Sequence, residues 1–256
     1  MFKINSSVIS YIGSVRKTNE DNFYMNGRNK TDSTTMELYF DEQQRDSYLY
    51  AVCDGMGGEH LGDLASLIAV ETLKQYQTTD IQQTLGDYIQ NTNKIICNEI
   101  KKNNVRIGTT LALLYICDNK AISYNIGDSR VYHIRHKKLT QISEDHTEAQ
   151  QLVKMGIINK EDACSHKTKN KLTQHLGIFP NEFIIEPFIS SEIEIIKNDV
   201  FLLCSDGFVD IISDIDIPEI LSVYENNFVV LTEKLTVILQ NTILKDNATV
   251  VIVKVC

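Results

Sequence analysis

Eight stretches of the chain show the apolar runs, or the alternation of apolar and polar residues, that predict β-strands. They span residues 5–13, 22–26, 48–53, 109–117, 121–126, 130–135, 200–204 and 248–254. Three other stretches repeat apolar residues every three or four positions, which predicts helices at 64–76, 81–100 and 231–242. We expect these apolar stripes to face the core rather than to hold a cofactor.

The order of these elements indicates the fold class. The strands 109–117, 121–126 and 130–135 are joined by turns of a few residues, the spacing of an antiparallel meander, whereas parallel strands need longer crossovers. Long helices precede this meander and follow it near the C-terminal end. We therefore expect an α+β fold in which two mainly antiparallel β-sheets pack as a sandwich, with helices on both outer faces.

The sequence shows no division into several domains. It contains no internal repeat, low-complexity tract or linker rich in proline and glycine, so we expect residues 1–256 to form a single domain. Residues 27–47 are interpreted as a solvent-exposed insertion in a hairpin, without recognisable chemistry. Residues 145–171 include a short predicted helix at 147–155 and are expected to form a mobile, flap-like excursion beside a functional site.

The composition, 43% hydrophobic and 23% charged over 256 residues, is typical of a globular protein with a sizeable core. No apolar run reaches the roughly 18 residues that a membrane span needs, and the N-terminal residues lack the apolar region of a signal peptide. The 6 cysteines form no Cys-x-x-Cys pair, as expected of thiols in a reducing compartment. We expect a cytoplasmic protein without a membrane partner.

The charge balance bears on the choice of partner. A formal net charge of -9 argues against nucleic acid, because binding to a phosphate backbone requires clustered lysine and arginine. The nearest basic run is Arg135-His136-Lys137-Lys138. We interpret this run as the tip of a hairpin rather than as a binding patch.

Carboxylates stand at the ends of several predicted strands. Two strands far apart in the sequence end in Asp-Gly, at Asp54 and Asp206, and a third strand is preceded by Asp246. Asp128 follows a strand of the meander, and Asp210 lies one helical turn beyond Asp206. A single Asp-Gly is a common hairpin turn, but carboxylates at so many element ends exceed what turns require. Together they predict an oxygen-rich site for a hard cation at one edge of the core.

Two further features strengthen this prediction. Asp54 is followed by Gly55 and more glycines, which would let backbone carbonyls approach a cation closely. Near the start of the chain, Arg16 precedes Glu20 and Asp21. Alone, this group would be read as a surface ion pair of little energetic effect. Beside a cation site, the guanidinium would provide donors for an oxyanion.

These residues belong to a longer series of motifs. In chain order the motifs are Arg16 with Asn19-Glu20-Asp21, Asp54-Gly55-Met56-Gly57-Gly58, Gly108-Thr109-Thr110, Gly127-Asp128-Ser129-Arg130, Leu172-Thr173 with Leu176-Gly177, Cys204-Ser205-Asp206-Gly207 and Asp246-Asn247. In order and approximate spacing they resemble the metal-dependent protein serine/threonine phosphatases of the PP2C (PPM) type. The resemblance covers nearly the whole chain. The methionine at position 56 of the Asp-Gly-Met-Gly-Gly motif is similar to the residue that bacterial stand-alone members of the family carry there.

The resemblance implies a two-metal centre at one end of the sandwich. In such enzymes the residue matching Asp54 bridges both metals, and the carbonyl of Gly55 helps to hold one of them. Asp206 and Asp246 match ligands of the other metal, while Glu20 matches a position that binds directly or through water. Carboxylate-rich shells select Mn²⁺ or Mg²⁺ over zinc, so we expect two of these ions.

The resemblance also implies a weaker third-metal site and a phosphate-binding residue. Asp128 with Asp206, and Asp210 as a further candidate, match the third-metal site. Arg16 matches the arginine that binds the phosphoryl group. The implied reaction is hydrolysis of phosphoserine and phosphothreonine monoesters by a water whose pKa two cations, about 3.5–4 Å apart, lower towards 7.

Other phosphatase chemistries find less support. A cysteine nucleophile requires an arginine six positions after a cysteine, and none of the 6 cysteines has one. The 6 histidines show no His-x-His or His-Glu-x-x-His spacing, and His146 is interpreted as structural. We therefore do not expect a zinc hydrolase.

The sequence departs from the family pattern at several positions. Met56 stands where animal members carry a histidine proposed as general acid, so the group that protonates the leaving alkoxide is not identified. Glu59 occupies a position that is often histidine, and Lys167 replaces a frequent proline in the flap-like segment.

We expect a metal-dependent phosphoprotein phosphatase that acts as a monomer on phosphoserine and phosphothreonine proteins and opposes a serine/threonine kinase. Two alternatives stay open, a non-catalytic phosphoprotein-binding module of the same fold and a phosphatase for small metabolites. Degenerate relatives usually lose ligand carboxylates, which this chain keeps. Assays with phosphopeptides and with metabolite phosphates would separate the three.

Overall fold

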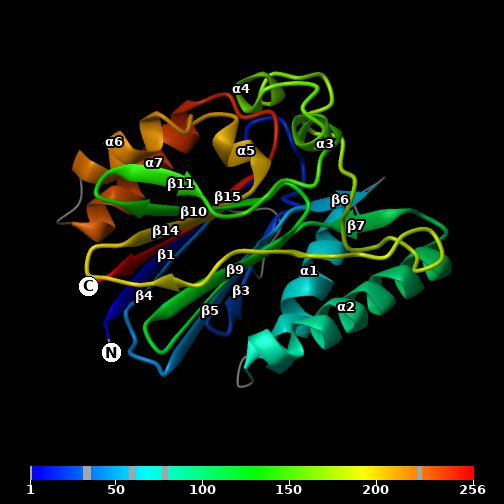
Figure 1. Ribbon diagram of the computed structural model, residues 1–256, viewed down its shortest axis with the longest axis horizontal. Coiled ribbons are helices and arrows are strands. Elements are labelled where there is room, and N and C mark those ends of the chain that lie inside the picture. The colour runs from blue at the N-terminus through cyan, green and yellow to red at the C-terminus, as the bar shows by residue number, and fades with distance from the viewer. Residues whose placement is uncertain (1, 31–35, 58–60, 77–79, 224–226) are drawn as a thin grey trace.

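Two antiparallel β-sheets lie face to face in the described part of the chain, residues 2–30, 36–57, 61–76, 80–223 and 227–256 of a computed structural model (Figure 1). The first sheet contains β1 (Ile4–Tyr11), β4 (Glu37–Asp41), β10 (Arg130–Arg135), β11 (Lys138–Gln141), β14 (Val200–Cys204) and β15 (Ala248–Val255). Its strand order is β11-β10-β14-β15-β1-β4, and each neighbouring pair is antiparallel. Strands from both ends of the sequence therefore meet in the middle of this sheet.

The second sheet is antiparallel as well. It contains β2 (Asn22–Met25), β3 (Arg28–Asn29), β5 (Ser47–Cys53), β8 (Leu111–Cys117), β9 (Lys120–Ile126), β12 (Phe188–Ile189) and β13 (Ile193–Glu194). The order is β12-β9-β8-β5-β2-β3, and β13 also pairs with β9. A separate short ladder joins β6 (Gly55–Gly57) to β7 (Ile107–Thr109).

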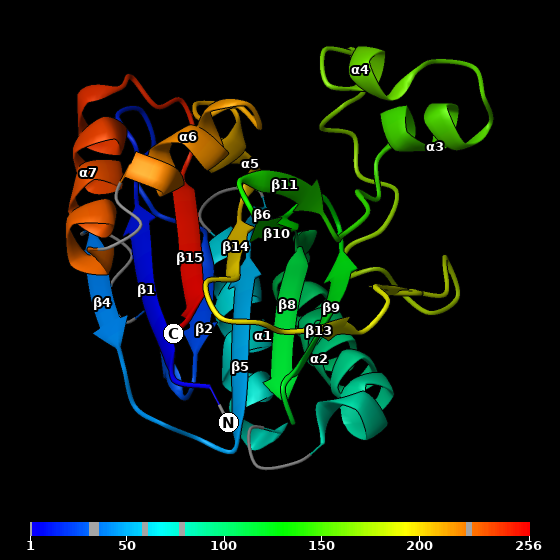
Figure 2. The same ribbon diagram turned by 60° about the vertical axis from the view of Figure 1, so that its left-hand side comes forward.

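Helices cover both outer faces of the sandwich (Figure 2). On the second sheet lie α1 (Gly62–Leu73), the 3₁₀-helix η1 (Lys74–Tyr76) and α2 (Ile81–Asn103). On the first sheet lie α5 (Asp206–Val209), α6 (Asp216–Val223) and α7 (Phe228–Asn241). The short helices α3 (Glu148–Lys154) and α4 (Lys160–Ala163) stand apart from the sandwich. The predicted α+β sandwich with helices on both faces is confirmed.

Strand β5 explains why the sandwich strands read as continuous apolar runs. Tyr48, Tyr50 and Val52 point into the core between the sheets, whereas Leu49 and Ala51 pack against the helices on the outer face. Successive side chains of a strand point to opposite faces, so a strand that is covered on both faces must be apolar at nearly every position. β15 is built in the same way, with Val251 and Val253 pointing inward and Val250 and Ile252 outward.

Helix α2 has end signals that its sequence carries itself. The side chain of Asp80 accepts a hydrogen bond from the backbone N–H of Gln82, which satisfies one free donor of the first turn. After the last turn, Asn104 adopts the left-handed conformation with φ 53°, which ends the helix. Among the described helices, none is long and apolar enough to cross a membrane.

The structure corrects the interpretation of residues 27–47. Its described part is not a single exposed insertion, because it contains β3 and the edge strand β4, which pairs with β1. Lys30 is buried, and its ammonium donates hydrogen bonds to the backbone carbonyls of Asn19 and Asp21. Residues 31–35 lie outside the described residues. An edge strand with polar flanks gives only a weak periodic signal, which is why this strand was not predicted.

Other elements also depart from the predicted pattern. The predicted strand 109–117 is interrupted at Thr110, where β7 ends and β8 begins. The short elements α5, α6 and β11 were not predicted. Each is too short for a periodic pattern to be recognised in the sequence, and each is held by the sheet it contacts.

Phe201→Ala should test the core between the sheets. Phe201 is fully buried there, so the substitution should lower the free energy of unfolding by about 3–5 kcal/mol. Urea denaturation provides the measurement. The control is Phe40→Ala in β4, where the ring is 38% exposed and a much smaller change is expected. Equal losses in both variants would contradict this description of the core.

Candidate metal centre

The antiparallel registers bring the predicted acidic residues to one end of the sandwich. Cys204 at the end of β14 lies opposite Val250 near the start of β15, so Asp206 and Asp246 emerge side by side. In the second sheet, Cys53 at the end of β5 lies opposite Asn22 at the start of β2. Asp54 therefore emerges beside the segment that contains Glu20 and Asp21. The last of the group, Asp128, occupies the turn between β9 and β10.

These carboxylates are close enough to influence one another. Burial raises the pKa of Asp54 well above its usual range, and neighbouring carboxylates raise it further. Those neighbours are Asp21, Asp206, Asp128 and Asp246. Burial likewise raises the pKa of Asp206, with added repulsion from Asp246 and Asp210, while a hydrogen bond with Asp54 partly offsets the rise. A site that holds so much negative charge is suited to positive ions.

Two other acidic residues in the group, Asp21 and Asp128, have strongly raised pKa values. Burial and the charge of Asp206 raise the pKa of Asp128 to about 8. Burial raises the pKa of Asp21 to about 7, although a hydrogen bond from Ser205 and the charge of Lys30 favour its ionised form. The nearby donor set consists of carboxylate and backbone oxygens, which suits Mn²⁺ or Mg²⁺ rather than zinc.

Asp246 differs from the other carboxylates because it forms an ion pair with an arginine. The guanidinium of Arg16 donates to Asp246 Oδ2 at 2.8 Å, and both side chains are about half exposed. Within the described ranges, no three His, Cys, Asp or Glu side chains already surround one point as a cation shell would.

Hydroxyl groups fix the backbone at Asp54. The backbone N–H of Asp54 donates to Thr110 Oγ1 at 2.8 Å, and its carbonyl accepts from the Thr110 N–H at 2.9 Å and from Thr109 Oγ1 at 2.9 Å. Thr110 Oγ1 also lies 2.6 Å from Ser129 Oγ, next to Asp128 in the β9–β10 turn. Thr110 thus connects two acidic turns through a buried hydrogen-bond chain.

A second buried network connects the two sheets below the carboxylates. Ser205 Oγ donates to Asp21 Oδ2 at 2.7 Å and accepts from the Thr249 N–H at 3.0 Å. The Lys30 ammonium donates to the backbone carbonyl of Asp21. Ser205 lies 184 residues from Asp21 in the sequence, so only the folded chain brings this pair together.

Asn247 holds the loop that carries Arg16 and Glu20. Its side-chain oxygen accepts from the Glu20 N–H at 2.8 Å, and its amide donates to the carbonyls of Ile12 and Thr18 at 2.8 and 3.1 Å. The amide therefore fastens the β1–β2 loop to the start of β15. This explains why an asparagine follows Asp246: it positions the neighbours of the site rather than binding an ion itself.

Gly55 is required by close packing at the site. A Cβ at this position would lie 2.1 Å from the carbonyl oxygen of Gly62 and 2.5 Å from that of Glu20. The backbone N–H of Gly55 also donates to the Glu20 carbonyl at 3.2 Å. Because Gly55 has no side chain, α1 and the Glu20 segment can approach the end of β5. Gly58 and Glu59, in the same segment, lie outside the described residues.

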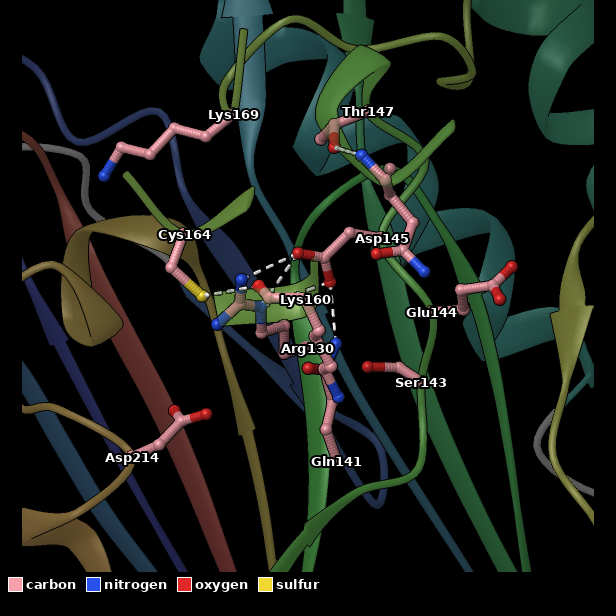
Figure 3. Close-up of polar contacts among 12 residues, drawn as sticks. Arg130, Gln141, Ser143, Glu144, Asp145, Thr147, Lys160, Cys164, Lys169 and Asp214 are labelled. Atoms are coloured by element: carbon pink, nitrogen blue, oxygen red, sulfur yellow. Dashed lines mark hydrogen bonds and ion pairs between the residues drawn. The ribbon is translucent and has the colours of Figure 1, made fainter. Parts of the chain in front are cut away.

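A cavity of about 650 Å³ adjoins the acidic group. Asp128, Asp206 and Asp210 line it, together with Lys160 and Lys169 from the flap-like segment 145–171. On its floor Asp145 receives three hydrogen bonds of 2.7–3.1 Å from the Arg130 guanidinium and one of 2.8 Å from Gln141 (Figure 3). The Lys169 ammonium lies 2.9 Å from Asp210 Oδ1, which joins the flap-like segment to the end of α5.

His146 supports the turn that carries Asp128. Its ring Nδ1 accepts from the Gly127 N–H at 3.2 Å, and its backbone N–H donates to the Gly127 carbonyl at 2.9 Å. Burial lowers the pKa of His146, which agrees with a neutral ring that accepts at Nδ1. These bonds support its interpretation as a structural residue.

Comparison with known proteins identifies the family. A family model described as "Protein phosphatase 2C" matches residues 24–246. The serine/threonine phosphatase stp of Listeria monocytogenes is 32% identical over 190 residues, which cover 70% of this chain and 74% of that protein. The chain belongs to the protein phosphatase 2C family.

Solved structures agree with this assignment. The serine/threonine phosphatase of S. agalactiae superposes with a TM-score of 0.83 at 25% identity, over 99% of this chain and 100% of that one. The catalytic domain of the phosphatase PstP, solved with two manganese ions, gives a TM-score of 0.76 at 28% identity, over 100% and 99% of the two chains. This protein phosphatase 2C member is accordingly a metal-dependent serine/threonine protein phosphatase.

Several supporting residues of this phosphatase were not given a role from the sequence. Asn19, Asp21, Thr110, Ser205 and Asn247 stand within the quoted motifs, but their types alone do not tell a ligand from a support. Their position directly beside the carboxylates was the available signal. Lys30 gave none, because it lies in a segment that had been interpreted as exposed.

The pH dependence of stability should report the crowded carboxylates. Asp21 and Asp128 have folded pKa values of about 7 and 8, above the unfolded value near 3.9. The folded protein then binds more protons than the unfolded chain between about pH 4 and 8, so its stability falls as pH rises through that range. In a chelator, we expect the Tm to fall by at least about 3 °C from pH 5 to pH 8.

Two comparisons make this measurement specific. Asp128→Asn should reduce the slope of Tm against pH, whereas Asp87→Asn on the exposed face of α2 should leave the slope unchanged. Added Mn²⁺ should stabilise the protein most at high pH, because cations bind the ionised carboxylates. A Tm in chelator that does not vary between pH 5 and 8 would contradict the electrostatic description.

Proposed function

We propose that this phosphatase hydrolyses phosphoserine and phosphothreonine monoesters with two Mn²⁺ or Mg²⁺ ions held at the carboxylate end of the sandwich. Asp54 would bridge the ions, with the Gly55 carbonyl beside it. Asp206 and Asp246 would hold one ion, and Glu20 would bind directly or through water. The observation that carries this proposal is the convergence of acidic side chains from distant strand ends, where burial and neighbouring carboxylates raise the pKa values of Asp54 and Asp206.

When bound, two such cations would lower the pKa of a water molecule and neutralise the negative charge of the phosphoryl group. The residues of the chain position the groups around them. Thr109 and Thr110 hold the backbone of Asp54, and Asn247 holds the loop that carries Glu20. These contacts reduce the reorganisation that binding would otherwise require.

Arg16 is proposed to bind the phosphoryl group. One guanidinium nitrogen contacts Asp246 at 2.8 Å, which sets the orientation of the side chain beside the proposed metal ligands. The Arg16 side chain is 47% exposed, so its remaining N–H groups can reach the oxygens of a phosphate carried by another protein. A planar fork of donors suits a tetrahedral phosphoryl group better than a lysine would.

A weaker third cation is proposed at Asp128, Asp206 and Asp210. These residues line the same cavity of about 650 Å³. Asp210 is held by Lys169 at 2.9 Å, so a cation at this place would compete with that ammonium. The weaker affinity expected of this site agrees with such competition.

For the domain organisation, the oligomeric state, the location and the partners of the protein, the proposal follows the sequence. We propose one domain over residues 1–256 with a flap at about 145–171, in which Lys167 replaces a frequent proline. We also propose a monomeric, cytoplasmic enzyme that opposes a serine/threonine kinase on shared phosphoprotein substrates.

Removal of a proposed ligand should abolish activity while the fold is retained. Asp54→Asn and Asp206→Asn should each lower Mn²⁺-dependent kcat/KM on a phosphothreonine peptide at least about 100-fold, because even groups outside the ligand shell change metal affinity by 10–100-fold. Calorimetry should show weaker Mn²⁺ binding in both variants. Asp87→Asn serves as the control. Undiminished turnover would exclude these residues as ligands.

Substitution of the phosphate-binding residue should have a different kinetic effect. Arg16→Ala should raise KM about tenfold or more, since charge-assisted hydrogen bonds to a dianion are lost, with a smaller change in kcat. Lys17→Ala, at the exposed neighbouring position, should leave KM nearly unchanged. An unaltered KM in Arg16→Ala would remove the proposed role.

A further inference from the structure

The end of the sandwich opposite the carboxylates carries a second, smaller cavity. Strands β10 and β14 pair from Arg130 opposite Cys204 to Ile134 opposite Val200. Asp128 and Asp206 stand just beyond one end of this pair, and the cavity stands at the other. Four residue steps of an antiparallel strand separate the two ends of this pair by about 14 Å. The smaller cavity is therefore remote from the reaction.

This cavity has an apolar floor and a basic rim. Its volume is about 340 Å³, within the range of ligand-binding pockets. The buried Ile134 and Leu221, together with Pro218, form the apolar floor. Ile196, at the rim, is 39% exposed. The basic residues that line the cavity are Arg135 at the end of β10, His136 and Lys137 in the β10–β11 turn, and Lys197 on the loop before β14.

An internal ion pair fixes the shape of the rim. Asp199 also lines the cavity, but its buried carboxylate is bound by the Arg135 guanidinium at 2.6 and 2.8 Å. Arg135 donates a further bond of 2.7 Å to the Glu194 carbonyl. Across the described residues, no ion pair engages Lys137 or Lys197. The two lysines therefore give a positive rim to a chain whose net charge is -9.

The hairpin residues are poorly suited to their turn. In three hairpins a two-residue loop has positive φ at both positions, namely Asn26-Gly27, Asp118-Asn119 and His136-Lys137. The first two use the residue types that such turns prefer. His136 and Lys137 adopt φ 52° and 63°, where a long side chain is disfavoured. A locally unfavourable choice that leaves cations at a cavity rim is typical of a binding surface.

We propose that this cavity docks an acidic segment of the phosphoprotein substrate, with one apolar side chain on its floor. The two lysines lie on separate loops, which suits separate carboxylates along an extended peptide better than one convergent phosphate group. The positive rim attracts such a segment, while the net negative charge of the enzyme discourages its binding elsewhere. Docking raises the local concentration of the phosphosite at the reaction centre. The inference builds on the phosphatase activity described above.

Phosphopeptides with a tethered acidic tail test this docking. One phosphothreonine sequence is followed by a Gly/Ser spacer and a tail of glutamates around a leucine. A spacer of three residues reaches at most about 10 Å, whereas one of fifteen has an average span of about 20 Å. With the long spacer, the tail should lower KM about tenfold relative to a tail with glutamine in place of glutamate, at unchanged kcat. The short spacer should give no advantage.

Matched variants separate docking from general charge effects. Lys137→Glu with Lys197→Glu should remove the KM advantage of the tail and leave hydrolysis of the untailed peptide unchanged. Lys94→Glu with Lys102→Glu, at exposed positions of α2, changes the net charge equally and should keep the advantage. A second pair, His136→Asn with Lys137→Gly, installs the preferred turn residues. It should raise the Tm while reducing the advantage.

The remaining outcomes contradict the proposal. It is overturned if the tail gives no advantage, or if both spacers give the same one. It is equally overturned if vesicles of anionic phospholipid bind the native protein, but not Lys137→Glu with Lys197→Glu, while the tail has no effect. Fluorescence anisotropy of the unphosphorylated tail reports docking without catalysis. Failure of docking is thereby distinguishable from failure of the phosphatase reaction.

Discussion

Crowded negative charge at one end of the β-sandwich is the constraint on which the rest of the site depends. Burial and the charge of Asp206 raise the pKa of Asp54 and of Asp128, and burial with the charges of Asp246 and Asp210 raises the pKa of Asp206 itself. Like charges held so closely are unfavourable unless protons or cations neutralise them. The antiparallel registers prevent the carboxylates from moving apart, since each follows directly from a strand end. Binding of divalent cations would therefore relieve a repulsion that the fold itself imposes.

The groups that hold these carboxylates in place are mostly uncharged. Thr110, Ser205 and Asn247 orient the acidic segments with hydroxyl and amide hydrogen bonds of 2.7–3.1 Å. Neutral donors can fix a backbone without cancelling the negative charge that a cation needs. Positively charged residues contact only the more exposed carboxylates, in the ion pairs Arg16–Asp246 and Lys169–Asp210. If Arg16 binds phosphate and Asp210 binds a cation, as proposed, both contacts would be exchanged on binding.

The strands β10 and β14 give the molecule opposite charges at their two ends. Their reaction end carries carboxylates, while their other end carries the lysines around the smaller cavity. A phosphoprotein has two chemically distinct features to recognise, the phosphate and the chain around it. Cations held by the carboxylates, as proposed, would recognise the phosphate, and the remote basic rim with its apolar floor would recognise the chain around it. Separation by the length of a strand lets each surface change without disturbing the other.

The sequence by itself determined the layered fold and the chemistry of the site. Strands covered on both faces must be apolar throughout, and acidic residues at their ends were visible as Asp-Gly and Asp-Asn dipeptides. The tertiary structure alone decided which support meets which acid. Ser205 reaches Asp21 across 184 residues, and the buried Lys30 donates its ammonium to the carbonyls of Asn19 and Asp21. Such pairs depend on long-range register, which local periodicity does not encode. The basic hairpin tip was likewise expected, but its place beside an apolar cavity follows only from the packing of α6 and the 196–199 loop.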